Sequence, residues 1–164
     1  MDVIEIIVRA ALVGIGGTVV LDLASLALER LFGVPAVNWK MVGRWVGHMP
    51  KGRFVQPNLK EAEPVPGEHA LGWAVHYVIG AAYGLLLVAI WGADWLQQPI
   101  VIPPLILVLA LLVLPYFMMM PGMGQGVAGS KTPNPIAARL KSVMGHSVFG
   151  LGMYLTAWLM AAAA

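Results

Sequence analysis

The chain has 164 residues, of which 59% are hydrophobic and only 11% are charged, and its formal net charge is +2. A soluble domain averages about 25% charged residues, so this composition cannot cover a water-soluble surface and places the chain in a membrane. Cysteine is absent, which excludes disulfides, thiolate metal sites and cysteine nucleophiles. The length suits one integral-membrane domain, residues 1–164.

Four apolar segments are each long enough to cross a bilayer core, which needs about 20 residues. They lie at about residues 3–31, 69–91, 100–120 and 136–160. Inside lipid each must be helical, because no water is present to satisfy open backbone groups. The expected fold class is therefore an all-α transmembrane four-helix bundle. Pro103, Pro104 and Pro115 predict that the third helix starts late or kinks.

The connection after the first span contains a second, shorter helical pattern. Asn38 is a good N-cap for a helix that runs to about Met49, and apolar residues recur within it at helical spacing. We expect this short helix to lie in the inner membrane interface, in the first cytoplasmic connection. Residues 56–67 follow with three prolines among charged residues, which is typical of a loop.

The connection before the fourth span, residues 121–135, reads PGMGQGVAGSKTPNP. It differs in spacing from a phosphate-binding P-loop and follows no strand, so we exclude nucleotide binding. Its backbone amides and Lys131 are suited to an anion-binding concavity, whereas the simpler interpretation is a tight turn. Asn134 and Pro135 are typical of a capped helix start. A third interpretation is a re-entrant element that lines a polar layer.

The basic residues predict the orientation. They concentrate in the first and third connections, whereas the second connection, residues 92–99, has none. The positive-inside rule then places the first and third connections in the cytoplasm and both termini on the outer side of the membrane. Because these basic residues flank apolar spans, nucleic acid is not an expected partner. Membrane lipids are expected partners. The expected contacts to lipid headgroups or other anions are Arg44, Lys51, Arg53 and Lys131.

Three of the spans carry a titratable residue: Asp22, His76 and His146. Such residues are costly in a bilayer and are functional candidates. Each lies on a stripe of small or polar residues spaced four apart, which also includes Thr18 and Ser142, so we expect it to face a neighbouring helix. With a helical rise of about 1.5 Å per residue, all three fall at similar depth in the inner leaflet. The sequence therefore predicts one shared polar site.

This polar site suits a proton relay, a substrate pocket or a metal site, while the alternative is that Asp22 only pairs with a histidine or a basic side chain to fix packing. The leading hypothesis is binding or passage of a small solute, ion or proton. The second is a non-catalytic accessory or scaffold protein that binds lipid and a membrane partner, and a homodimer is also open. The third is a redox protein with a haem or metal at His76 and His146. The cofactor stays open, with none as the leading expectation. An enzyme is not excluded, but no catalytic residue is assigned, since no nucleophile–base pair or zinc motif occurs.

A set of short blocks resembles a known family. The blocks are Asn38-Trp39, Val42-Gly43-Arg44-Trp45, His48-Met49, Gly52-Arg53-Phe54, Gly67-Glu68, Leu71-Gly72-Trp73, His76-Tyr77, Pro121-Gly122-Met123-Gly124, Ser130-Lys131-Thr132-Pro133, His146 and Phe149-Gly150. Over nearly its whole length the chain resembles the bacterial integral-membrane domain-of-unknown-function family 2938. The resemblance implies a small multi-span protein of the bacterial inner membrane, and with the orientation above both termini are expected in the periplasm. It implies no established reaction, so no functional residue is carried over.

Overall fold

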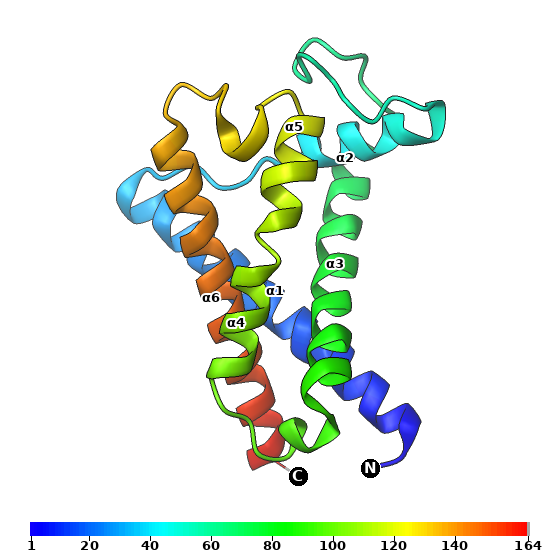
Figure 1. Ribbon diagram of the computed structural model, residues 1–164, viewed down its shortest axis with the longest axis vertical. Coiled ribbons are helices and arrows are strands. Elements are labelled where there is room, and N and C mark those ends of the chain that lie inside the picture. Colours follow the sequence, from blue (N-terminus) through cyan, green and yellow to red (C-terminus); the bar gives the residue numbers. More distant parts are fainter. Residues whose placement is uncertain (164) are drawn as a thin grey trace. The chain divides into compact units, whose positions relative to one another are not determined.

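The computed structural model describes residues 1–163, and every regular element in that range is a helix (Figure 1). This confirms the all-α prediction. The α-helices are α1 (Val3–Phe32), α2 (Trp39–His48), α3 (Glu68–Trp91), α4 (Ile102–Ala110), α5 (Met120–Gly122) and α6 (Pro135–Ala162). Three short 3-10 helices, Met49–Lys51, Ala93–Leu96 and Val127–Gly129, and one π-helix, Pro115–Met119, lie between them.

Four helical segments are long and apolar enough to cross a membrane: α1, α3, Ile102–Gly122 and α6. The 24 residues of α3 extend about 36 Å, more than the roughly 30 Å of a hydrocarbon core. The predicted short helix is also present as α2, and the side chain of Asn38 caps it by accepting a hydrogen bond from the Met41 amide at 3.3 Å.

The third apolar segment is interrupted, as its prolines predict. Pro115 has no N–H to donate to the carbonyl of Leu111, which instead accepts from the Leu114 amide at 3.0 Å. The backbone then widens into the π-helix, whose Pro115 carbonyl accepts from the Met120 amide. The proline therefore separates α4 from α5.

The packing divides the chain into two compact units. Unit 1 comprises Met1–Ala36, Tyr77–Ala110 and Met144–Ala164. Unit 2 comprises Val37–His76 and Leu111–Val143. Unit 2 has eight basic and three acidic residues, a net charge of +5, whereas unit 1 has two basic and five acidic residues, a net charge of −3.

Within unit 1, α1 packs closely on α3 through glycines. A Cβ added at Gly14 would overlap the carbonyl oxygen of Gly80, and one added at Gly84 would overlap that of Ala10. Small residues of this kind let the backbones of membrane helices touch, as the stripe of small residues predicts.

A second face of α1 packs on α6. A Cβ at Gly17 would lie 2.7 Å from Cγ of Met153, and a Cβ at Gly152 would lie 2.7 Å from Cβ of Val20. Met153 is fully buried. In unit 1, α1 therefore uses separate small-residue faces for α3 and for α6.

Candidate functional site

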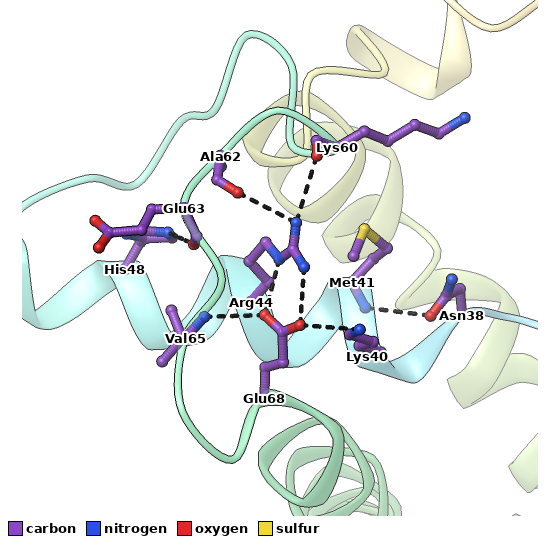
Figure 2. A network of polar contacts seen from close by, with 10 residues as sticks. All are labelled: Asn38, Lys40, Met41, Arg44, His48, Lys60, Ala62, Glu63, Val65 and Glu68. Carbon is purple, nitrogen blue, oxygen red and sulfur yellow. Dashed lines mark hydrogen bonds and ion pairs between the residues drawn. The ribbon is translucent and has the colours of Figure 1, made fainter.

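The most strongly built polar feature of unit 2 is a buried ion pair between α2 and the first residue of α3. Arg44 Nε donates to Glu68 Oε2, and Arg44 Nη2 donates to Glu68 Oε1, both at 2.8 Å (Figure 2). Arg44 is 7% exposed and Glu68 is 6% exposed. This two-bond geometry is the strongest arrangement that a guanidinium and a carboxylate form.

Every side of this pair has further partners. Arg44 Nη1 donates to the carbonyl oxygens of Lys60 at 3.4 Å and Ala62 at 3.1 Å. Glu68 also accepts from the Val65 amide at 3.0 Å, and Lys40 Nζ lies 3.4 Å from its Oε1. The hydrogen bond with Glu68 raises the pKa of Arg44 above its ordinary value, so its guanidinium stays charged. The pair thus ties the loop before α3 to α2.

His48 fixes the same loop from another position on α2. It is 1% exposed, and its Nε2 lies 2.9 Å from the carbonyl oxygen of Glu63 (Figure 2). Because a carbonyl only accepts, Nε2 carries the proton. Its Nδ1 is buried without a hydrogen-bond partner among residues 1–163.

Glycines allow α2 to cross α3 at backbone contact. A Cβ added at Gly43 would overlap the carbonyl oxygen of Glu68, and one added at Gly72 would overlap that of Trp39. A glycine inside a helix lowers helix propensity, so Gly43 is unfavourable for α2 when only the local sequence is considered. The structure shows the reason for it, because a side chain at this position would separate Arg44 from Glu68.

In unit 1, one polar contact joins two of the apolar helices. The hydroxyl of Tyr77 on α3 donates to Asp22 Oδ2 on α1 at 2.9 Å, and both residues are half-buried. Sequence reasoning missed Tyr77. It precedes Gly80 by three and Gly84 by seven positions, a spacing that places it on the same helix face and was available in the sequence.

Thr18, which was predicted to belong to the polar site, lies one turn from Asp22 on α1. It is 1% exposed, and its hydroxyl donates to the carbonyl oxygen of Gly14 at 2.9 Å. A Cβ added at Gly80 would overlap that hydroxyl. Thr18 therefore contributes to helix packing, with its hydrogen bond satisfied inside its own helix.

His76 is buried in an aromatic cluster of unit 2. Its ring stacks on Trp39 with 3.7 Å between centroids and an interplanar angle of 21°, and it meets Trp73 edge-on at 5.8 Å. Asp22 and His146 belong to unit 1, whereas His76 and Ser142 belong to unit 2. The shared site of Asp22, His76 and His146 therefore stays a prediction.

A metal or haem at His76 and His146 likewise stays a prediction. Within residues 1–163, no three or more histidine, aspartate or glutamate side chains form a group that could hold a metal ion.

The predicted anion or lipid contacts divide into two classes. Lys51, Arg53 and Lys131 are exposed, as such contacts require. Arg44 is not, because its guanidinium is buried on Glu68, and this corrects its predicted lipid contact. Arg44 occupies a polar position of an amphipathic helix, and in the sequence such a position looks the same whether the side chain is buried or on the surface.

Lys131 lines a pocket of about 450 Å³ in unit 2. The lining residues come from the loop after α2 and from the glycine-rich connection: Val55, Pro57, Pro121, Gly124, Gly126, Val127, Ser130 and Lys131. Several amides of this connection are already paired, since Ser130 donates to Val127 at 3.0 Å and Lys131 donates to Gln125 at 2.8 Å. The predicted anion-binding concavity would therefore depend on the side chains of Lys131 and Ser130.

The end of the glycine-rich connection is fixed by α6. Asn134 Oδ1 accepts from the Ala137 amide at 3.0 Å, and the helix begins at Pro135, as the sequence predicts. Arg139 Nε donates at 2.9 Å to the carbonyl oxygen of Ala128, a non-glycine residue with φ of +49°. That φ lies in the left-handed region, which is unfavourable for alanine, so the Arg139 contact helps to hold it.

Four helices are long and apolar enough to cross a membrane, which is typical of helical membrane proteins. The chain belongs to the domain-of-unknown-function family 2938, whose profile, described as a protein of unknown function (DUF2938), matches residues 11–160. This confirms the predicted family. Neither a curated protein nor a solved structure matches the chain. The family description names no activity.

Proposed function

We propose that this protein binds or passes a small solute, ion or proton at a polar site in the inner leaflet, with Asp22 as its titratable group. The observation that supports this most directly is the 2.9 Å hydrogen bond from Tyr77 to Asp22, because it joins two helices that could both cross a membrane. A carboxylate at such a position is costly and is retained mainly where it has a function. The tyrosine hydroxyl positions the carboxylate against α3.

The packing of α1 on α3 favours a proton or a small ion over a larger solute. One turn from Asp22, the hydroxyl of Thr18 touches Gly80, and two turns away the backbones of Gly14 and Gly80 are in contact. Where these contacts lie, the two helices leave no room between them for a molecule the size of a metabolite. A proton needs only titratable groups and hydrogen-bonded water.

Reconstitution into proteoliposomes tests this function. An imposed proton gradient or membrane potential should drive acidification, reported by an enclosed pH-sensitive dye, and Asp22→Asn should abolish it. Tyr77→Phe should reduce the flux, because the carboxylate loses its positioning hydrogen bond. Glu29→Gln, an exposed carboxylate on the same helix, is the matched control. Flux that is the same with Asp22→Asn as with the natural chain would rule out this function.

A second function, an accessory or scaffold protein that binds lipid and a membrane partner, is favoured by the charge of unit 2. A net charge of +5 on so small a unit suits an anionic surface, because each basic residue near such a surface contributes about 1 kcal/mol. This function predicts a stoichiometric complex with one membrane protein after extraction in mild detergent. A chain that purifies alone, or only with copies of itself, would contradict it.

A further inference from the structure

The pocket beside the glycine-rich connection lies between two segments that are firmly joined. The Gln56 amide donates to the carbonyl oxygen of Gly122 at 2.8 Å. A Cβ added at Gly124, whose φ is +80°, would lie 2.5 Å from the carbonyl oxygens of Gln56 and Pro57. The pocket walls are thus held by backbone contacts on both sides.

The lining of this pocket combines one cation with apolar surface. Lys131 is its only charged residue and Ser130 supplies a hydroxyl, while valines, prolines and glycines form the remainder. Its volume of about 450 Å³ falls in the range of about 300–1,000 Å³ that is typical of small-ligand sites. Such a lining is complementary to a molecule with an anionic end and an apolar end.

The surroundings indicate which amphiphile that is. Phe54, Val55 and Val127 are 61%, 64% and 50% exposed, an unfavourable arrangement in water and a normal one against lipid. Lys51 and Arg53 are exposed just before Phe54 in the chain. Exposed basic and apolar residues that are adjacent in the chain, in a unit of net charge +5, complement an anionic phospholipid.

We propose that this pocket binds the phosphate-bearing headgroup of one anionic phospholipid. The Lys131 ammonium pairs with the phosphate, the Ser130 hydroxyl donates a hydrogen bond to it, and Val55 and Val127 contact the apolar part of the lipid. The proposal deepens the lipid-binding function by naming its site and ligand. It does not depend on Asp22 or on ion passage.

Native mass spectrometry of the purified full chain, titrated with phosphatidylglycerol or phosphatidylcholine, tests the proposal. One phosphatidylglycerol should bind in preference to phosphatidylcholine. Lys131→Gln should weaken phosphatidylglycerol binding about fivefold, which corresponds to about 1 kcal/mol for one basic residue at a lipid surface. Lys60→Gln, an exposed lysine of the same unit outside the pocket lining, is the matched control and should leave the affinity unchanged. Equal affinities for Lys131→Gln and the natural chain would overturn the site.

Two further arms separate a lipid from a soluble phosphate compound. Val127→Asn should weaken phosphatidylglycerol binding while the chain keeps its size-exclusion profile and its melting temperature. Glycerol 3-phosphate should displace the lipid only at far higher concentration. Displacement at equal concentration would assign the pocket to a soluble phosphate monoester and would overturn the lipid proposal.

The flux assay separates this site from the proposed intramembrane one. Lys131→Gln should retain any flux that depends on Asp22, so failure at either site is recognised on its own.

Discussion

The buried ion pair between Arg44 and Glu68 makes the substitution Glu68→Gln the most informative change in unit 2. It removes the negative charge and replaces one of the two acceptor oxygens by an amide NH2 group, so the buried Arg44 guanidinium keeps only neutral acceptors, the new amide oxygen and the carbonyl oxygens of Lys60 and Ala62. Removing one partner of a buried pair typically costs about 3–5 kcal/mol. Because these neutral acceptors remain, we expect Glu68→Gln to lie near the lower end of that range, at about 3 kcal/mol.

The converse substitution should cost less. In Arg44→Met, Glu68 keeps the Val65 amide and the Lys40 ammonium, so its charge stays balanced. We expect a loss of about 2 kcal/mol, in the range of a hydrogen bond to a charged group. The double variant should be less destabilised than the sum of the two single ones, because neither charge is then left alone.

Hydrogen exchange of residues 53–67, followed by mass spectrometry, measures directly how much each substitution destabilises the loop. If the pair holds this loop, Glu68→Gln should raise the exchange rate there roughly 100-fold, as expected for about 3 kcal/mol of local opening. Glu61→Gln, an exposed carboxylate in the same loop, is the control. A change of less than about fivefold in Glu68→Gln would refute the idea that the ion pair holds the loop.

Two other predictions concern packing and orientation. Gly14→Ala should destabilise the protein by about 1–3 kcal/mol, since its methyl group overlaps the Gly80 carbonyl, whereas Gly145→Ala, with nothing nearer than 3.9 Å, should be nearly neutral in detergent melting curves. Equal melting temperatures would contradict the close contact. An alkaline phosphatase fused to the C-terminus should be active if both termini are periplasmic. A fluorescent cytoplasmic reporter at that end would reverse the orientation.

Local signals predicted much of the fold. Asn38 predicted the start of α2, and Asn134 with Pro135 predicted the start of α6. Pro115 predicted the break between α4 and α5. Capping and the missing proline N–H act within a few residues, so the local sequence shows them. Apolar length alone located the candidate spans. These features depend on residues that are neighbours along the chain, so a single sequence is sufficient to predict them.

The polar contacts were harder to predict from the sequence. Arg44 and Glu68 are 24 positions apart, across a loop with no periodicity, so Arg44 read as a surface cation. Tyr77 and Asp22 are 55 positions apart, and a tyrosine in an apolar helix attracts no notice by composition. Burial and long-range pairing are properties of the packed chain, and only the small-residue stripe on α3 pointed to Tyr77.

The two glycine faces of α1 have a consequence for biogenesis. α1 leaves the ribosome before either of its packing partners, and α6, which supplies Met153 and Gly152, begins only at Pro135. A single apolar helix is stable in lipid, but its small-residue faces gain contacts only after insertion of the others. Unit 1 therefore assembles late, and until α6 arrives the Gly17 face of α1 is open to chaperones, proteases or mispairing with foreign helices.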